Sequence, residues 1–406
     1  MAILKLGSVD EGKLPQDKFM FLKPYHKGMV AGLQNKKKFR DEANGTWQDF
    51  LEVPGGNIKK LQQFLKDAGF YPNSEVTGIF GYGTLAATRL FQEYVRQVEG
   101  NEAIGTPDGV VGPKTWEHIN RWQRDGVSCE WGNFSSNKPS EAYNFWMGIL
   151  DKAKGHYQQL LNPVLDEVRK KWKNTDTLPP EAWDFNEGKV HLIGIRRNYQ
   201  NTAQNRENDD VFILLIKGMA FTFWGSTDPN PKLADRKDEP YLVEGQHKYR
   251  FGWHKISNEV QVYKALRPFS NGVLVFRDKT NTNALTENNV GHGLDAPNTT
   301  INIHWSGDGD FNFSAGCQVI AGKSYLDHTG KLVDCRGYAS ESYAGLANGK
   351  TRGAYNVLAD LVTCYAPKAT EEVWYTLGRE DNLTEIAGAT VMGKLEQNLK
   401  QLRFTF

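Results

Sequence analysis

A histidine and a cysteine lie thirteen residues apart in a stretch that is rich in glycine and small polar residues. His304 closes the strand-like segment TTINIH, and Cys317 follows a loop of Gly, Asp, Asn and Ser. A free thiol has a pKa of about 8.5, so it supplies little thiolate at neutral pH unless a nearby base takes its proton. An imidazole within reach does this. The pair therefore predicts a cysteine nucleophile, Cys317, with His304 as its base.

Small residues in front of the cysteine suit it to acyl transfer. Ser314 and Gly316 leave the backbone before Cys317 open, so the N–H groups there are candidates for an oxyanion hole. Ser306 is a candidate to orient the imidazole, although a backbone carbonyl performs that task equally well. The competing interpretation is a buried cysteine with an unrelated histidine nearby.

Two further residues near the pair are candidates to contact a substrate. His292, in GHGLD, could line a groove, although a histidine between glycines is more often a solvated loop residue. Trp305 could stack on a sugar or fill a strand face, and the sequence favours neither. Among the other cysteines, Cys335 is a weaker candidate nucleophile, whereas Cys364 lies on the apolar stripe of a predicted helix.

The segments around the pair have the patterning of strands. Short stretches rich in β-branched or aromatic residues recur, namely VHLIGIRR, VFILLIKGMAFTFWG, KYRFGW, GVLVFRD, TTINIHW and CQVIA. Lys217 and Gly218 interrupt the longest of them, which indicates two buried strands. We therefore predict a mainly antiparallel β domain over residues 186–345, followed by a helical C-terminal segment over residues 346–406 that packs on it.

An internal repeat marks a second domain toward the N-terminus. TGIFGYGT and DGVVGPKT share the form G-apolar-apolar-G-x-x-T and lie 31 residues apart. Apolar residues at helical spacing precede the first copy and follow it. Because glycine permits positive φ and threonine can cap a first helical turn, each copy predicts a tight turn that leads into a helix. The expected result is a small bundle of three helices.

This repeat region, residues 57–122, resembles the three-helix peptidoglycan-binding domain that accompanies many cell-wall enzymes. The motif positions are Gly78, Gly81, Thr84, Asp108, Gly109, Gly112 and Thr115. ILKLGS resembles the opening of such a domain but is separated from it by a charged stretch. We therefore expect a domain over residues 1–125 with an insertion near 10–55, followed by a helical linker over 126–185. The alternative is a bundle that only docks against its neighbours.

The residues around the cysteine carry a second resemblance. His304, Ser314, Gly316 and Cys317 match the motif of the L,D-transpeptidase (YkuD-like) family, and the chain is most similar to phage-type lysis and cell-wall proteins with INIH followed by GCQ. The resemblance implies a β-sandwich-like catalytic domain that acts on the stem peptides of peptidoglycan, with the Cys as nucleophile and the His as base. The segments IGIR, TDPNP and Arg277-Asp278 share that group's pattern, which makes Arg277 a candidate substrate-binding residue.

Two positions depart from the commoner family motif. Ala315 stands where the family has a second histidine, and Val319 stands where it has an arginine expected to hold the substrate. Cross-link formation is therefore less expected than nucleophile chemistry. The sequence favours hydrolysis of a stem peptide, by an L,D-carboxypeptidase or endopeptidase, and leaves L,D-transpeptidation open.

The composition argues against nucleic acid, a membrane and a metal ion as partners. The 49 basic and 48 acidic residues leave a net charge of +1, which provides no field for nucleic acid or an anionic membrane surface. No apolar segment is long enough to span a bilayer. The four cysteines show no CxxC spacing, so we expect neither a structural zinc site nor a disulfide framework, and no metal or other cofactor. The sequence thus predicts an α+β multidomain protein whose partner is peptidoglycan.

Three rival functions stay open. A zinc-dependent peptidoglycan peptidase requires clustered ligands, but the chain has neither H-x-H nor H-E-x-x-H. A glycosidase requires paired carboxylates, which the sequence neither names nor excludes. A non-catalytic wall-binding protein would keep all its properties after Cys317→Ser.

The N-terminal stretch MAILKLGSVDEGK lacks the continuous apolar run of a secretory signal. The expectation is therefore synthesis in the cytoplasm and action on peptidoglycan in the periplasm or cell wall after delivery by a non-Sec route. Phage lysis or a type VI secretion system that carries an antibacterial effector toxin would fit, and the latter would imply a secretion carrier and an immunity protein.

Overall fold

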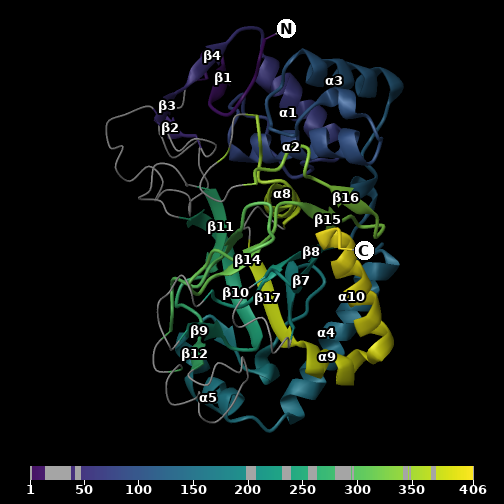
Figure 1. The fold of residues 1–406 in the computed structure, drawn as a ribbon. Helices are drawn as coiled ribbons and strands as arrows, with labels where there is room; N and C mark the ends of the chain where they lie inside the picture. The colour runs from purple at the N-terminus through teal and green to yellow at the C-terminus, as the bar shows by residue number, and fades with distance from the viewer. Residues whose placement is uncertain are drawn as a thin grey trace. The chain divides into compact units, whose positions relative to one another are not determined.

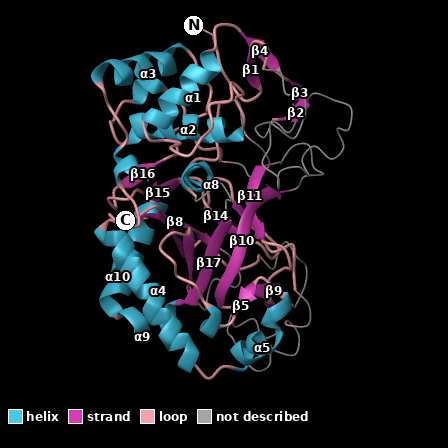
Figure 2. Cartoon of the chain, turned by 180° about the vertical axis from the view of Figure 1, so that it is seen from behind, coloured by secondary structure: helices cyan, strands magenta, loops and turns pink. Residues whose placement is uncertain are grey.

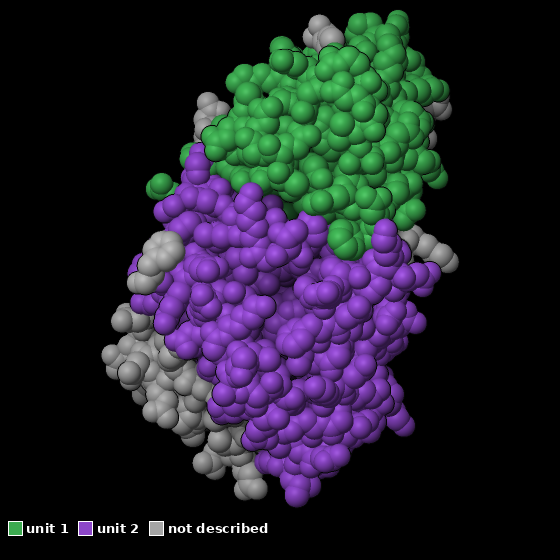
Figure 3. All heavy atoms as spheres, turned by 90° about the vertical axis from the view of Figure 1, so that its right-hand side faces the viewer, with its two compact units in different colours: residues 1–134, 252–264, 338–371 green, residues 135–251, 265–337, 372–406 purple. Residues whose placement is uncertain are grey.

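The computed structural model describes residues 2–13, 38–41, 47–197, 207–230, 239–254, 263–278, 294, 297–341, 346, 349–366 and 372–405. Figure 1 shows its helices and strands. The chain forms two compact units (Figure 3): unit 1 comprises residues 1–134, 252–264 and 338–371, and unit 2 comprises residues 135–251, 265–337 and 372–406. Each unit therefore combines segments from distant parts of the chain, whereas the sequence predicts consecutive domains.

Three helices in unit 1 confirm the expected bundle. They are α1 (Asn57–Asp67), α2 (Tyr82–Gln97) and α3 (Pro113–Asp125), joined in part by the short 3-10 helix η3 (Glu102–Ile104). Aromatic rings fill the space between them: Phe91 of α2 packs edge-on against Phe64 of α1 at 5.1 Å and against Trp122 of α3 at 5.2 Å. Such pairs add directional attraction to the burial of large apolar surfaces.

A buried glutamine holds each repeated turn. In the first turn, the Gln62 side-chain oxygen accepts the N–H group of Gly78 at 2.9 Å, and its nitrogen donates to the Thr84 hydroxyl at 3.1 Å. In the second turn, Gln92 accepts from Gly109 at 2.8 Å and donates to the Thr115 hydroxyl at 3.1 Å. The two turns therefore repeat the same hydrogen bonds, which explains why the repeat keeps both its glycines and its threonine.

Short strands flank the expected insertion. Strand β1 (Ser8–Asp10) pairs in parallel with β4 (Leu51–Val53), and β2 (Lys38–Arg40) pairs with β3 (Trp47–Asp49) in antiparallel fashion. The Asp10 carboxylate accepts the N–H groups of Ile58 and Lys59 at 2.9 and 3.0 Å. It thereby satisfies the first turn of α1, which has no capping side chain of its own. Much of the expected insertion near 10–55 lies outside the described residues.

A fourth helix belongs to unit 1. Helix α8 (Ala354–Tyr365) packs against α2, where the Arg89 guanidinium forms two hydrogen bonds of 2.7 Å with the buried Asp360 carboxylate. The sequence places this helix in a C-terminal segment packed on the β domain. Helix α8 belongs to unit 1, but it also contacts a strand of the barrel, because its Tyr355 hydroxyl donates to the Lys264 carbonyl at 2.7 Å.

Eight strands close into a barrel, mainly in unit 2. Their order is β14, β13, β11, β10, β17, β6, β7, β8, and β8 also pairs with β14. They span β6 (His191–Arg196), β7 (Asp210–Ile216), β8 (Met219–Ser226), β10 (Gly245–His254), β11 (Tyr263–Pro268), β13 (Ile303–Trp305), β14 (Gln318–Ile320) and β17 (Glu372–Arg379). Figure 2 shows β11, β10 and β17 side by side. Strands β13 and β14 run parallel, as do β6 and β17, and the pairs β6–β7, β7–β8 and β10–β17 are antiparallel.

Smaller strands extend the barrel or stand beside it. Strand β5 (Thr177–Leu178) pairs with β10, and β15 (Ser324–Leu326) joins β8 to β16 (Leu332–Asp334). Strands β9 (Glu239–Leu242) and β12 (Val275–Asp278) form a separate antiparallel pair. Lys217 and Gly218 join β7 to β8 with positive φ angles of 51° and 78°, which confirms the expected pair of buried strands.

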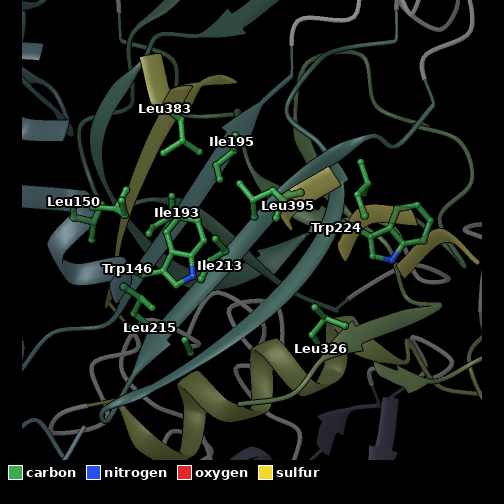
Figure 4. Close-up of a cluster of buried hydrophobic side chains, with 14 of the residues drawn as sticks. Trp146, Leu150, Ile193, Ile195, Ile213, Leu215, Trp224, Leu326, Leu383 and Leu395 are labelled. Atoms are coloured by element: carbon green, nitrogen blue, oxygen red, sulfur yellow. The ribbon is translucent and has the colours of Figure 1, made fainter. Parts of the chain in front are cut away.

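Helices cover one side of the barrel wall. They are α4 (Glu141–Gln159), α9 (Glu380–Ala387) and α10 (Ala389–Arg403). Alternate residues of β6 and β7 point into this layer, as Figure 4 shows for Ile193, Ile195, Ile213 and Leu215, which pack with Trp146 of α4. The expected helical linker is therefore part of the unit 2 core.

The predicted linker contains two helices, because α4 ends at Gln159 and a second helix begins at Pro163. Asn162 accepts the N–H group of Val164 at 2.8 Å and starts the separate helix α5 (Pro163–Lys171), because a proline suits the first turn of a helix but not its interior. Short 3-10 turns lie on either side of these helices: η4 (Glu130–Asn133), η5 (Trp172–Asn174) and η6 (Pro180–Ala182).

The C-terminal segment is also not entirely helical. Residues 372–379 form β17, a strand with a neighbour on each side, and only α9 and α10 follow it as helices. The alternation in EVWYTLGR explains the difference: Tyr375 pairs with His247 of β10 and stacks on Phe212 of β7, while Trp374 faces the other way. No helix in the described part of the chain is long and apolar enough to cross a membrane.

Candidate active site

The structure brings His304 and Cys317 to neighbouring strands. His304 is the central residue of β13, and Cys317 immediately precedes β14. The parallel register pairs His304 with Val319, and Gln318 donates its N–H group to the Asn302 carbonyl at 2.9 Å. Continued by one residue, this register places Cys317 beside Asn302. Residues two apart along a strand lie on the same face, so His304 and Cys317 occupy diagonal positions on one face of the β13–β14 pair.

The His304 imidazole is held in one tautomer. Its side chain is buried, and Nδ1 lies 2.8 Å from the Trp305 carbonyl oxygen. A carbonyl only accepts hydrogen bonds, so Nδ1 carries the proton and the neutral ring keeps its lone pair on Nε2. This is the form of histidine that can take a proton from a thiol.

Cys317 differs from the other three cysteines in its exposure. Cys317 is partly exposed, whereas Cys129, Cys335 and Cys364 are buried. Burial raises the pKa of the Cys129 thiol, which makes it a poor source of thiolate. Cys335, the weaker candidate nucleophile, is fully buried and inaccessible to a substrate in this structure.

Backbone groups surround the Cys317 sulfur. Sγ accepts the N–H group of Asn302 at 3.3 Å, and it donates to the Thr300 carbonyl at 3.2 Å. A bond from an N–H group to sulfur favours the thiolate over the thiol. The donation from Sγ to the Thr300 carbonyl instead favours the thiol, so these two contacts act in opposite directions.

The turn before the cysteine requires glycine and is braced by serine. A Cβ atom built on Gly316 would lie 2.8 Å from Cγ of Pro240, too close for any larger residue without movement. The buried Ser314 hydroxyl accepts the Gly316 N–H group at 3.4 Å, a long bond that a better acceptor could replace. An oxyanion hole at this turn stays a prediction.

The IGIR and TDPNP segments, which the sequence connects only through a family resemblance, contain buried charged residues. Arg196, at the end of β6, is completely buried and forms an ion pair of 3.1 Å with Asp228. Its guanidinium also donates to the Thr227 hydroxyl at 3.2 Å and to the Leu242 carbonyl at 3.2 Å. The IGIR and TDPNP segments therefore meet in space.

This charged cluster is connected to the cysteine turn through two asparagines. The Asp228 carbonyl accepts a hydrogen bond from the buried Asn312 side chain. Asn230 donates from its backbone to the Ser314 carbonyl at 2.6 Å, and from its side chain to the Asn312 carbonyl at 2.6 Å. Arg196 therefore positions the turn indirectly, because it fixes the segment on which that turn rests.

Two further carboxyl groups belong to the same buried region. Burial, together with the charge of Asp228, raises the pKa of Asp210, against the opposing effect of N–H donors from Thr227 and Arg197. Burial, followed by the charges of Asp210 and Asp228, raises the pKa of Asp209. A raised folded pKa means that the folded state binds the proton more tightly than the unfolded state does.

The Asp209→Asn variant is expected to gain stability relative to wild type as the pH rises. In wild type, the free energy of unfolding falls from about pH 4, the ordinary carboxyl value, up to the raised folded pKa, by at most about 1.4 kcal/mol per pH unit for this group. Asparagine does not titrate and resembles the protonated acid. Urea unfolding at pH 5 and pH 8 measures the difference, with the half-exposed Asp310→Asn as matched control. Parallel pH profiles for Asp209→Asn and wild type would contradict the prediction.

The structure places the three candidate substrate-binding residues in different environments. Trp305, for which the sequence favours neither stacking on a sugar nor filling a strand face, is only 1% exposed and fills a strand face, which corrects its place among the candidate substrate-binding residues. Arg277 is half-buried on β12 and pairs with Pro240, the residue that packs against Gly316, so it stays a candidate. His292 lies outside the described residues.

The Ser306 hydroxyl has a different partner from the one considered above. It donates to the Phe311 carbonyl at 3.0 Å, and a hydroxyl has one proton to donate. The imidazole is instead bound at Nδ1 by the Trp305 carbonyl. Ser306 therefore stabilises the loop between His304 and Cys317.

The same loop exposes two aromatic residues that sequence reasoning missed. Phe311 and Phe313 are 54% and 49% exposed, whereas Asn312 between them is buried. Because Asn312 is anchored in the interior, the phenylalanines on either side of it face outward. In the sequence, the alternation of phenylalanine with polar residues in DFNFS could have indicated that both rings lie on one face of an extended segment.

No group of three or more His, Cys, Asp or Glu residues within the described ranges is arranged to hold a metal ion.

The N-terminal region matches a known family of domains. Residues 54–119 match the family model described as "Putative peptidoglycan binding domain". These residues form a peptidoglycan-binding domain. Its match nearly coincides with the expected core at residues 57–122.

The motif residues of the peptidoglycan-binding domain have structural roles in its turns. Gly78 and Gly109 adopt positive φ angles of 78° and 82°, and the hydroxyls of Thr84 and Thr115 bind the two buried glutamines. Asp108 accepts the N–H group of Val110 at 2.8 Å. Gly81 and Gly112 are the residues that precede α2 and α3.

Comparisons over longer spans are weaker. A Kitasatospora aureofaciens protein named "Uncharacterized protein in bpoA1 3'region" is 34% identical over 77 residues, which are 19% of this chain and 58% of that protein. The chain therefore matches little more than half the length of that relative. A crystal structure of a fused Zn-dependent amidase/peptidase/peptidoglycan-binding domain-containing protein from Clostridium acetobutylicum ATCC 824 aligns with 83% of this chain and 98% of that chain, at 12% identity. Its TM-score of 0.23 is too low to support an argument about fold or chemistry.

Proposed function

We propose that this protein is a peptidoglycan-directed cysteine enzyme that acts on stem peptides, with Cys317 as nucleophile and His304 as base. One observation carries the proposal: the partly exposed Cys317 shares a face of the β13–β14 pair with an imidazole whose Nδ1 is bound to a carbonyl. The peptidoglycan-binding domain at residues 54–119 supports the choice of substrate.

The proposed reaction begins with proton transfer from Sγ of Cys317 to Nε2 of His304. The thiolate attacks a carbonyl carbon of the stem peptide, and the C–N bond of the tetrahedral intermediate breaks as the imidazolium gives its proton to the leaving amine. This leaves a thioester on Cys317. Water then releases the acid with His304 again as base, or a second amine replaces water and forms a cross-link.

Hydrolysis is the preferred outcome. Val319, at the position where the commoner motif has a substrate-holding arginine, is completely buried and cannot contact a substrate. Ala315 also lacks the second histidine of that motif. Without these groups, a bound acceptor amine has fewer contacts, whereas water needs none.

The decisive experiment is a muropeptide profile. Purified wall sacculi are incubated with wild type and with Cys317→Ala, and the products are analysed by liquid chromatography and mass spectrometry. Shortened stems or opened cross-links with wild type alone would support the proposal, and the product masses identify the bond.

Two controls separate the rival functions. Sedimentation with sacculi shows that the variant still binds the wall, and activity that survives treatment with a chelator excludes dependence on zinc. If wild type binds sacculi but leaves the profile of untreated wall, the protein is a non-catalytic wall-binding protein instead.

A further inference from the structure

A groove in unit 2 lies apart from the cysteine turn. Residues 141–146 of α4 and 390–398 of α10 form it together with β8 and the turn between β15 and β16, on the side of unit 2 that faces the viewer in Figure 3. Its volume is about 580 Å³, within the range of about 300 to 1,000 Å³ typical of small-ligand sites. Residues that line it include Glu141, Phe145, Thr222, Thr329, Lys394 and Asn398.

An exposed aromatic ring lies in this groove. Phe145 is 46% exposed, and its ring is held edge-on by Trp146 at 5.2 Å between ring centroids. Burial of a phenylalanine side chain is favourable, and this residue forgoes much of that stabilisation. The other aromatic residues of α4 are buried, whereas Phe145 lines the groove, so its ring is available to a ligand bound there.

The remaining lining combines apolar side chains with polar ones of mixed charge, because Asp327 and His328 line the groove together with Glu141 and Lys394. Thr222 and Thr329 contribute hydroxyls, Asn398 contributes an amide, and Glu141 and Lys394 carry opposite charges. The Thr329 hydroxyl donates to the Asp327 carboxylate at 2.6 Å, so its oxygen remains able to accept. Hydroxyls and an amide around a flat apolar ring complement a sugar, which has an apolar C–H face and a rim of hydroxyl and acetamido groups.

We propose that this groove is a saccharide-binding site, with Phe145 stacked on a pyranose ring and Asn398 bonded to its polar rim. The mixed charge of the lining, with two carboxylates, a lysine and a histidine, disfavours a strongly anionic or cationic ligand, and its hydroxyl and amide groups disfavour a purely apolar one. This inference goes beyond the chemistry proposed for Cys317, because it assigns sugar recognition to a different surface of unit 2.

The test is to titrate the full chain with N-acetylchitotetraose and to measure binding by isothermal titration calorimetry and by saturation-transfer NMR. This ligand contains no peptide, so the outcome does not depend on whether Cys317 is a nucleophile. Phe145→Ala is expected to weaken binding about tenfold, since aromatic contacts contribute roughly 0.5–1.5 kcal/mol beyond the area that they bury. Leu161→Ala, at a position that is 97% exposed and does not line the groove, is the matched control and should bind like wild type.

A second variant guards against a change in fold. Asn398→Ala leaves the aromatic pair intact and is also expected to weaken binding several-fold. If wild type binds the tetrasaccharide and both groove variants bind it equally well, the sugar occupies another surface, such as the peptidoglycan-binding domain, and the proposal is wrong. Absence of binding by wild type, or displacement of the sugar only by peptides, would also overturn it.

Discussion

Cys317→Ala is expected to release stem-peptide products at least about 10³-fold more slowly than wild type, because it removes the atom that forms the thioester. The loss should not come from unfolding. The side chain is partly exposed, and alanine removes only one sulfur atom. Initial rates on sacculi measure the loss, and urea unfolding provides the control, with stability expected to change by less than about 1 kcal/mol.

His304→Gln provides an independent test of the same pair. Glutamine approximates the size of the imidazole and remains polar, but it cannot act as a base. General-base catalysis contributes about 10²- to 10⁴-fold, so a loss in that range is expected.

The double variant distinguishes a working pair from two unrelated residues. Residues that act as a unit show strongly non-additive losses, so Cys317→Ala with His304→Gln should be no slower than Cys317→Ala alone. Multiplicative losses, or full activity in either single variant, would contradict the assignment of nucleophile and base.

Arg196→Met is expected to lower the free energy of unfolding by about 3–5 kcal/mol, because removal of one partner leaves a buried charge uncompensated. The uncompensated group is Asp228, which pairs with Arg196 at 3.1 Å and is itself buried. Methionine keeps much of the side-chain volume, so a large loss would reflect charge more than packing. Arg124→Met, at an ion pair that is mostly exposed, should leave the stability close to that of wild type.

The same variant tests the connection from Arg196 to the cysteine turn. The Asp228 carbonyl and Asn230 hold Asn312 and Ser314, so movement of their segment should slow alkylation of Cys317 at a temperature where the variant remains folded. Asp228→Asn in the Arg196→Met background should restore part of the stability, because it removes the unpaired charge. Equal stability of Arg196→Met and wild type would show that the ion pair is dispensable.

Some features of this protein follow directly from the sequence. The glycines and threonines of the repeat predict both turns of the peptidoglycan-binding domain, because positive φ and turn-to-helix contacts are local requirements. Lys217-Gly218 marks the β7–β8 hairpin for the same reason. The His304 and Cys317 spacing predicts neighbouring strands, since a loop of that length can join two strands of one sheet.

Other features were decided only by contacts between distant residues. Helical patterning over residues 346–406 could not show that α8 supplies Asp360 to Arg89, or that the following segment becomes β17 between β10 and β6. Nor could strand patterning show that Trp305 is buried or that Arg196 meets Asp228. Periodicity within a segment determines its own conformation and its apolar face. Which surface that face meets, and which charges it buries together, depends on closure of the barrel by residues far apart in the chain.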